Sequence, residues 1–282
     1  MDVALVLSSG GARGLAQIGA IEELEAQGYR ITSIAGCSMG ALIGGVYAAG
    51  KMEEFREWMK TVDRKKMLEL TDFSFSLNHL VKGNRIIGAI MEFVPDVLIE
   101  DLPIPYCAVA TDWKSGHEVV FRKGSLFKAI RASISLPSFY EPVERDGMIL
   151  IDGGVTNPIP MNRVVRHDGD IMVAVDVSGH DYKTQYDIQH ELAEKRRNSK
   201  SLTQQILNKL IPDNLDFNYY TMLSRVSSLM IRQNSILMAK LMNPDVLVDI
   251  QMSRYGTFDY DKSEKLIAIG RQKTRQVLEK KR

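Results

Sequence analysis

The chain has 282 residues, of which 45% are hydrophobic and 25% charged, and 36 basic against 35 acidic residues give a formal net charge of +1. This composition is typical of a soluble globular protein and excludes disorder, collagen or coiled coil for the whole chain. Because the chain has no basic excess, we expect no nucleic-acid partner. Two cysteines are too few for a fold stabilised mainly by disulfides.

The N-terminal segment does not have the pattern of a secretory signal, because no positive charge precedes its short apolar run, Val3 to Leu7. Residues 31–50 carry no charge and are long enough to cross a bilayer, but five of them are glycine. We interpret this stretch as a strand, a tight turn and a buried helix. We therefore expect a cytoplasmic protein without a transmembrane span, with Cys37 and Cys107 as buried free thiols.

The predicted elements alternate between strand and helix from the start of the chain. A strand at 3–7 precedes a helix at 12–27, and a strand at 32–37 precedes an all-apolar helix at 39–49. This order indicates a parallel α/β sheet. Later strands are predicted at 106–111, 118–122, 148–151, 171–177 and 246–250, and later helices at 52–61, 83–93, 125–133 and 262–281.

The first chemical motif is G-x-S-x-G, from Gly36 to Gly40, between a predicted strand and a predicted helix. In that context the motif forms a nucleophile elbow, and glycines two residues to either side of the serine let strand and helix approach closely. We predict Ser38 as a nucleophile, with a glycine-rich packing turn as the structural alternative. Cys37 is a weak rival because the neighbouring side chain points elsewhere.

The second motif is the glycine-rich turn that begins at Ser9, where backbone N–H groups can point toward an anion. A dinucleotide fingerprint fits poorly, because Ser9 replaces its first glycine and no acidic residue closes the second strand. Parallel neighbouring strands would place this turn and Ser38 at the same sheet edge. We therefore predict an oxyanion hole beside Ser38. The predicted oxyanion loop consists of Gly10, Gly11, Ala12, Arg13 and Gly14, in which Arg13 stabilises either the loop or the anion.

The third motif is D-G-G, formed by Asp152, Gly153 and Gly154, which on its own is a common turn. A serine nucleophile needs a base, usually a histidine. In the chain order of α/β-hydrolases, that base would be His167, His180 or His190. The nucleophile follows only the second predicted strand, however, which is early for that fold. The alternative is that Asp152 acts directly as the base, because burial can raise the pKa of a carboxyl group.

With these three motifs in order, the chain resembles the bacterial branch of the patatin-like phospholipase family. That family combines a glycine-rich loop ending in R-G or K-G with a G-x-S-x-G elbow and a D-G-G or D-G-A aspartate. The resemblance covers most of residues 1–180 and again about 244–280. Further similar stretches are VATDWKSGHEVVF at 109–121, Arg131 to Pro137, FYEPV at 139–143 and Asn157 to Pro160.

The resemblance implies a patatin-like three-layer α/β fold with a mainly parallel central sheet, helices on both faces and a helical elaboration. We interpret residues 1–282 as a single patatin-like domain with a mostly helical insertion at about 180–243; a domain boundary near 180 is the alternative, but no Gly/Pro-rich linker marks one. The resemblance also implies a serine esterase or phospholipase that hydrolyses acyl esters of lipids, with a lipid or phospholipid ester as substrate. No cofactor and no metal are implied.

The site residues implied by the resemblance are a Ser38–Asp152 dyad that works without histidine. Ser38 would attack the ester carbonyl, and Asp152 would accept its proton and later activate water. The backbone N–H groups of the oxyanion loop would hold the oxyanion. Ser9 stands where the family often has glycine, so a side chain is present in a tight loop. The same residues would also serve a lipid acyltransferase, or remain in a weakly active lipid-binding or regulatory scaffold.

Two segments of the sequence are candidates for contact with lipid. The sequence predicts no oligomeric state. The C-terminal helix has six basic residues and one acidic residue between Arg271 and Arg282, which predicts a solvated helix end or a peripheral contact with an anionic membrane. The second half of the 180–243 elaboration has apolar residues at helical spacing, which favours core packing or an acyl groove. These residues are Met222, Leu223, Val226, Met230, Leu237, Met238, Leu241 and Met242.

Overall fold

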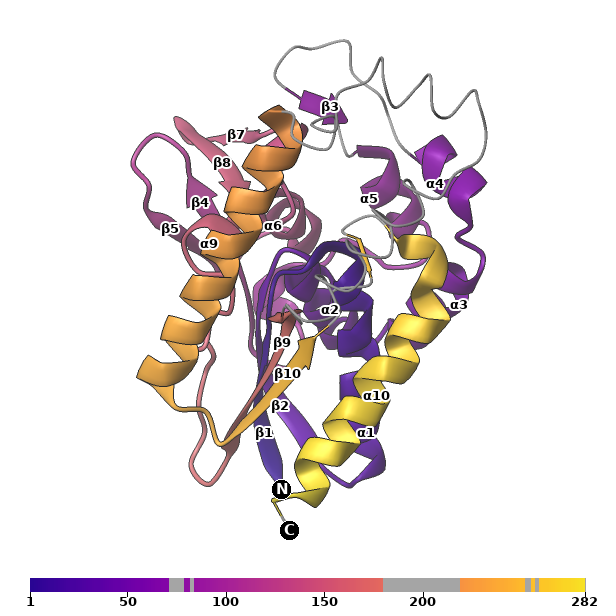
Figure 1. Cartoon of the computed structure of the whole chain (residues 1–282), viewed down its shortest axis with the longest axis vertical. Helices are drawn as coiled ribbons and strands as arrows, with labels where there is room; N and C mark the ends of the chain where they lie inside the picture. The colour runs from indigo at the N-terminus through magenta and orange to yellow at the C-terminus, as the bar shows by residue number, and fades with distance from the viewer. Residues whose placement is uncertain (71–78, 82–83, 180–218, 252–254, 257–258, 282) are drawn as a thin grey trace, which may run out of the picture.

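The computed structural model describes residues 1–70, 79–81, 84–179, 219–251, 255–256 and 259–281 (Figure 1). Its centre is an eight-stranded sheet in the order β10-β9-β1-β2-β4-β8-β7, with β5 paired to β4. The strands of this sheet are β1 (Asp2–Leu7), β2 (Arg30–Cys37), β4 (Tyr106–Asp112), β5 (Glu118–Phe121), β7 (Val143–Arg145), β8 (Met148–Asp152), β9 (Ile171–Gly179) and β10 (Val246–Gln251); β3 (His79–Val81) and β6 (Ser138–Tyr140) pair separately.

The neighbouring strands from β10 to β4 run parallel, whereas β5, β7 and β8 are antiparallel additions. Central strand β1 is apolar along almost its whole length because helices cover both faces of the sheet. This confirms the predicted α/β class and the mainly parallel sheet. In the pairing of β1 with β2, Leu7 lies opposite Gly36, so the glycine-rich turns that follow these strands leave from the same sheet edge.

Helices form layers on both sides of this sheet (Figure 1). One buried cluster joins the sheet to α1, α2 and α10, and a second cluster on the other face includes side chains of α9. The helices are α1 (Ala16–Ala26), α2 (Met39–Ala48), α3 (Met52–Lys60), α4 (Arg64–Leu70), α5 (Asn84–Met91), α6 (Leu126–Ser133), α9 (Tyr219–Met242) and α10 (Ser263–Glu279), with short 3-10 turns η1 (Gly11–Leu15), η2 (Ile99–Asp101), η3 (Gly153–Val155) and η4 (Tyr260–Lys262).

Most predicted elements end within two residues of the observed ones. The helix predicted at 12–27 differs, because its first turn is the tighter η1 and the α-helix begins only at Ala16. The uncharged stretch at 31–50 is the end of β2, the elbow and the buried helix α2, as expected. In the described ranges we find no helix long and apolar enough to span a membrane.

The helical elaboration predicted at 180–243 lies outside the described residues as far as 218, and its described part is α9. The expectation of core packing for its apolar residues is wrong for five of the eight, which are exposed to solvent, whereas an acyl groove stays a prediction. Met238 and Met242 do pack against the second cluster, and the Leu223 side chain is not described. Periodicity placed these residues on a helix but could not say that the helix lies at the surface. The exposed five are Met222, Val226, Met230, Leu237 and Leu241.

Helices α1 and α10 cross at two glycines. A Cβ added at Gly19 would lie 1.9 Å from the carbonyl oxygen of Ile267, and one added at Gly270 would lie 1.8 Å from that of Ala16. The two helix backbones are therefore in direct contact. This close crossing attaches the C-terminal helix to the layer that covers β1.

Ion pairs between α10 and α1 also use part of the basic charge noted in the sequence. Arg275 pairs with Glu23 at 2.9 Å, and Arg271 pairs with Glu22. These pairs reduce the charge that this end of α10 can offer to a membrane. A membrane contact by this helix stays a prediction.

We expect Gly270→Ala to lower the free energy of unfolding by about 1–3 kcal/mol, because the added methyl group would overlap the α1 backbone. Gly88→Ala is the matched control in α5, since no atom lies within 4 Å of its Cβ position. That control should raise stability by about 0.5–1 kcal/mol. Urea denaturation of both variants tests this. Equal effects of the two substitutions would contradict the close crossing.

Candidate active site

The turn between β2 and α2 holds Ser38 in a strained backbone conformation, with φ 53° and ψ −120°. The flanking glycines are required by contact. A Cβ at Gly36 would lie 2.4 Å from the carbonyl oxygen of Gly40, and one at Gly40 would lie 2.3 Å from that of Leu7. The motif thus forms the sharp strand-to-helix elbow predicted from its spacing, and it presses against the end of β1.

A second serine, Ser133, holds the backbone of the elbow by a hydrogen bond. The Ser38 backbone N–H donates to Ser133 Oγ at 2.8 Å, and Ser133 Oγ donates to the carbonyl oxygen of Val109 at 2.6 Å. Ser133 lies at the end of α6 and is fully buried. The sequence gives Ser133 no role of its own, and the one feature that points to it is its position in the family-like stretch 131–137. It connects the elbow to β4 and α6.

The side chain of Ser38 contacts a carboxylate from β8, which is separated from β2 by β4 alone. Ser38 Oγ donates to Asp152 Oδ2 at 2.5 Å, and the other carboxylate oxygen, Oδ1, accepts from the Gly154 backbone N–H at 2.7 Å. Both side chains are nearly buried, with exposures of 9% for Ser38 and 4% for Asp152. The sequence separates these two residues by 114 positions, and the pairing of β8 with β4 brings them together.

The D-G-G turn leaves no room for side chains. A Cβ at Gly153 would lie 2.2 Å from the carbonyl oxygen of Val109, and one at Gly154 would lie 3.0 Å from Asp152 Oδ1. The backbone of Asp152 is fixed as well, because its N–H donates to the carbonyl oxygen of Ser135 at 2.9 Å. The carboxylate therefore has a defined position against Ser38.

Burial raises the pKa of Asp152 to about 6, although the hydrogen bonds from Ser38 and the Gly154 N–H lower it. A carboxyl group in an apolar site holds its proton more tightly than in water, because the charged form is poorly solvated. It is therefore a stronger base than an aspartate at the surface. Near neutral pH the carboxylate form, which can accept a proton, still predominates.

The predicted oxyanion loop lies beside this pair. Gly10 and Gly11 lie at the start of η1, where the first N–H groups of a helix have no intrahelical acceptor. Among the backbone hydrogen bonds of the described residues, neither of these N–H groups is a donor. The loop fits tightly, because a Cβ at Gly10 would lie 2.3 Å from Val177 and one at Gly14 would lie 2.2 Å from Met39. Two N–H groups are thus available close to the elbow.

Side chains around the loop hold its backbone. Ser8 Oγ accepts the Val177 N–H at 3.0 Å, and Gln17 Nε2 donates to the Ser8 carbonyl oxygen at 2.7 Å. Arg13 Nε donates to the Gly10 carbonyl oxygen at 3.2 Å, which is a contact with the loop itself. Burial lowers the pKa of Arg13, while the negative charge of Asp176 opposes that change. The hydrogen bond of Ser8 with Val177 and the attraction of Arg13 to Asp176 thus connect the loop to the end of β9.

The side chain of Ser9 is buried at the same place. Its Oγ would lie 3.2 Å from a Cβ at Gly154, and it has no hydrogen-bond partner among the described residues. Its backbone N–H donates to the carbonyl oxygen of Pro158 at 2.8 Å. The serine therefore fits in the loop without displacing Gly10 or Gly11.

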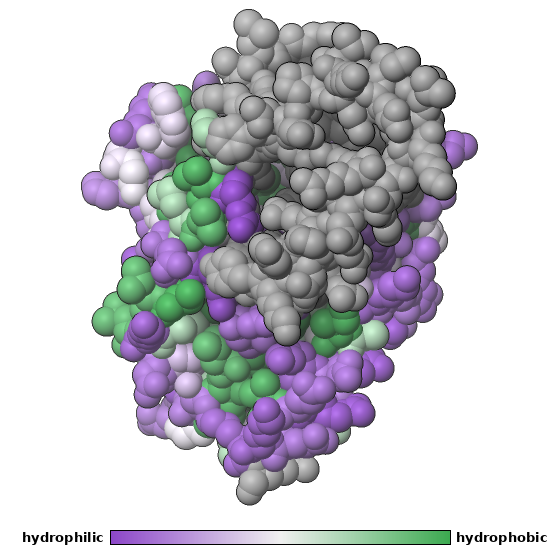
Figure 2. All heavy atoms as spheres, in the orientation of Figure 1, coloured by the Kyte–Doolittle hydropathy of each residue, from purple (hydrophilic) through white to green (hydrophobic). Residues whose placement is uncertain are grey.

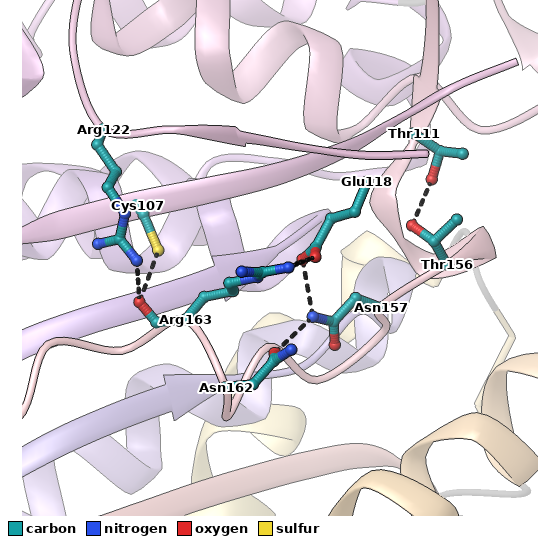
Figure 3. A network of polar contacts seen from close by, with 8 residues as sticks. All are labelled: Cys107, Thr111, Glu118, Arg122, Thr156, Asn157, Asn162 and Arg163. Atoms are coloured by element: carbon teal, nitrogen blue, oxygen red, sulfur yellow. Dashed lines mark hydrogen bonds and ion pairs between the residues drawn. The ribbon is translucent and has the colours of Figure 1, made fainter. Parts of the chain in front are cut away.

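A polar network holds the segment that follows the D-G-G turn (Figure 3). Asn157 Nδ2 donates to Glu118 Oε1 and to Asn162 Oδ1, both at 2.8 Å. Arg163 Nε donates to the other oxygen of Glu118 at 2.9 Å. These contacts connect the family-like segment that starts at Asn157 with β5. The network is structural support for the turn and lies outside the dyad.

The alternative bases and nucleophiles are placed differently. His167 is exposed in the turn before β9, at the sheet edge opposite the elbow, so it cannot contact Ser38. His180 and His190 lie outside the described residues. Burial and the nearby Asp152 charge raise the pKa of the Cys37 thiol well above its usual range, which disfavours the reactive thiolate. In the described ranges no group of three His, Cys, Asp or Glu side chains could hold a metal ion.

Comparison with known proteins agrees with this geometry. The family model described as patatin-like phospholipase matches residues 5–165, more than half of the chain. The chain belongs to the patatin-like phospholipase family. The matched range contains the oxyanion loop, the elbow and the D-G-G turn, and the fold is the mixed α/β arrangement expected for it.

Two similar proteins each match nearly two thirds of the chain. An uncharacterized NTE family protein of Mycobacterium tuberculosis is 47% identical over 177 residues, which are 63% of this chain and 49% of that protein. Neuropathy target esterase sws of Drosophila melanogaster is 32% identical over 187 residues, 64% of this chain and 13% of the larger protein. The chain thus matches about half of the mycobacterial relative. The solved structure of VipD from Legionella pneumophila, with 14% identity, covers 99% of this chain and 66% of that one at a TM-score of 0.49, too distant to support an inference.

The raised pKa of Asp152 predicts that this patatin-like protein loses stability as this buried carboxyl group ionises. Between about pH 4 and 6 the folded state keeps a proton that the unfolded chain releases, so stability falls as pH rises through this window. We expect Asp152→Asn to raise the free energy of unfolding by about 2–3 kcal/mol at pH 7, with little effect at pH 4.

Urea denaturation at both pH values tests this, with Asp168→Asn as the control at an exposed turn. The control should unfold as wild type does. If Asp152→Asn were less stable than wild type at both pH values, the hydrogen bonds to the carboxylate would outweigh the cost of its burial, and the prediction would be wrong.

Proposed function

We propose that the protein is a serine hydrolase of lipid acyl esters, of the phospholipase A type, which works through a Ser38–Asp152 dyad. The observation that carries the proposal is the 2.5 Å hydrogen bond from Ser38 Oγ to a buried carboxylate at a nucleophile elbow. Membership of the patatin-like phospholipase family supports it. The similarity to a neuropathy target esterase points to the same type of ester chemistry.

In the first half of the proposed reaction, Ser38 Oγ attacks the ester carbonyl carbon while its proton moves to Asp152 Oδ2. The carbonyl oxygen becomes an oxyanion, and the N–H groups of Gly10 and Gly11 donate hydrogen bonds to it. The N-terminus of α2 adds a favourable dipole at Ser38. The C–O bond to the alcohol then breaks, and the departing oxygen takes the proton back from Asp152.

In the second half, water attacks the acyl-enzyme. Asp152 accepts a proton from this water as its oxygen bonds to the acyl carbon, and the oxyanion forms again in the same loop. The bond to Ser38 Oγ then breaks, the proton returns to Ser38, and the fatty acid is released. One carboxylate thus serves as base and acid in both halves.

A raised pKa explains how a carboxylate can replace histidine. A base works best when its pKa lies near the working pH, and burial brings Asp152 to about 6. The Gly154 N–H fixes one carboxylate oxygen at 2.7 Å, which leaves the other directed at Ser38. In a triad the imidazole supplies a base of suitable pKa that is directed at the serine. Here the position of the carboxylate and its burial together supply such a base.

We also infer that residues 1–282 form a single patatin-like domain with an insertion at about 180–243. The support is that β10, which follows the insertion, pairs with β9, and that α10 packs against α1. The chain after the insertion therefore completes the same sheet and the same helical layer.

A fluorophosphonate probe tests the nucleophile directly. Peptide mass spectrometry should find the adduct on Ser38 in wild type, no adduct in Ser38→Ala and a strongly slowed reaction in Asp152→Asn, because the serine then lacks its base. His167→Ala should react as wild type does. An unlabelled wild-type protein would favour the scaffold interpretation. Products formed with an added alcohol acceptor would separate hydrolysis from acyl transfer.

The pH dependence tests the base. We expect kcat/KM for a short-chain ester to rise with pH and to level off above about 6, since Asp152 must be ionised to accept the proton. Stopped-flow or steady-state rates across this range measure the profile. A rate that falls as pH rises through the same window would rule out Asp152 as the base.

A further inference from the structure

Helix α9 exposes a stripe of large apolar side chains that the proposed chemistry does not use. In a helix of 3.6 residues per turn, its members fall within about 100° of the circumference. Figure 2 shows hydrophobic surface on the left of the molecule, where α9 runs. The outer stripe consists of Met222, Val226, Met230, Leu237 and Leu241, with exposures of 42%, 47%, 56%, 61% and 77%.

The opposite side of α9 is firmly attached to the sheet, so the outer stripe has a fixed direction. Arg232 donates to Asp176 at 2.9 Å and to both carboxylate oxygens of Asp249, at 3.1 and 2.8 Å. These two aspartates lie opposite each other on β9 and β10, so one guanidinium binds both strands. Met238 and Met242 add apolar packing on the same side. Rotation of the helix to bury the stripe would break these contacts.

The charge of α9 indicates what the stripe contacts. Its 24 residues include no aspartate or glutamate. Lys240 is exposed at one edge of the stripe, and Arg225 is exposed near the same edge although it also interacts with another residue. An apolar face flanked by basic residues binds the boundary between headgroups and acyl chains of an anionic lipid surface. A second copy on the same stripe would place basic residues against basic residues, because a two-fold contact uses the same surface twice.

The position of α9 places such a lipid surface near the dyad. Ile231 Cδ1 would lie 3.5 Å from a Cβ at Gly154, so the middle of the helix borders the turn that holds Asp152. From there the N-terminal half of α9 continues past the sheet edge that carries the elbow (Figure 1).

We propose that the outer stripe docks α9 on an anionic lipid membrane, with the sheet edge that carries Ser38 close to the bilayer. Burial of the five apolar side chains provides the main attraction, and the basic residues select anionic lipid. Only the delivery of substrate from that membrane rests on the proposed function. The docking itself does not need the dyad.

Sedimentation with vesicles tests the docking. The full chain is mixed with vesicles of phosphatidylcholine alone or with an equal part of phosphatidylglycerol, at low and high salt. We expect binding to the anionic vesicles that weakens with salt. The double variant Leu237→Glu/Leu241→Glu should bind at least about tenfold more weakly, because two apolar side chains that the membrane would bury become charged. Leu98→Glu, which changes an exposed leucine in a different element, just before η2, should bind as wild type does.

Thermal unfolding of each variant shows whether it is folded, and both changed leucines are exposed, so we expect no loss of stability. Wild type that stays in the supernatant with anionic vesicles would overturn the proposal, as would a folded double variant that binds like wild type. Light scattering that finds a wild-type dimer and a monomeric double variant would assign the stripe to self-association and also overturn it. Ser38→Ala should bind vesicles normally. If wild type binds vesicles but Ser38 is not labelled, the proposed function fails and the docking stands.

Discussion

The close approach of the elbow to the end of β1 is the constraint on which the site depends. No side chain fits at Gly40, because its Cβ position is 2.3 Å from the carbonyl oxygen of Leu7. This contact brings the predicted oxyanion loop, which follows β1, against the turn that holds Ser38. The parallel pairing of β1 with β2 makes the approach possible, since parallel strands end at the same edge. The course of the backbone therefore places the candidate nucleophile next to the candidate N–H donors.

Burial of the carboxylate connects function with stability. Asp152 is buried where its charge is costly, and that cost is what raises its pKa to about 6. Two neighbouring groups limit the effect, because Ser38 and the Gly154 N–H donate to the carboxylate. In the proposed reaction this destabilising charge is useful, because a solvated aspartate would be too weak a base. Such a conflict between a stable core and a reactive group is common where catalysis needs a perturbed pKa.

The two helices that bear on lipid contact differ in how the fold uses their charge. Basic residues are most frequent at the end of α10, yet Arg271 and Arg275 pair with acidic residues of α1. Helix α9 has fewer basic residues but no acidic ones, and five of its large apolar side chains point outward. The distribution of charge along the sequence favoured α10 as the helix that contacts a membrane. The packing of side chains in the structure favours α9 instead. Ion pairs with distant residues are invisible to a local charge count.

The sequence by itself determined the order of strands and helices, the elbow at Ser38, the glycine-rich loop and Asp152 as a candidate base. These features depend on local spacing, because glycines at fixed distances from a serine or an aspartate are typical of tight turns and close backbone contacts. Only the tertiary structure placed Ser38 Oγ 2.5 Å from Asp152 and revealed Ser133 as the acceptor for the elbow N–H, because both contacts join segments far apart in the chain. It also decided that five large apolar residues of α9 face outward. Helical periodicity defines a face of a helix, but which face is buried depends on what the rest of the chain places against it.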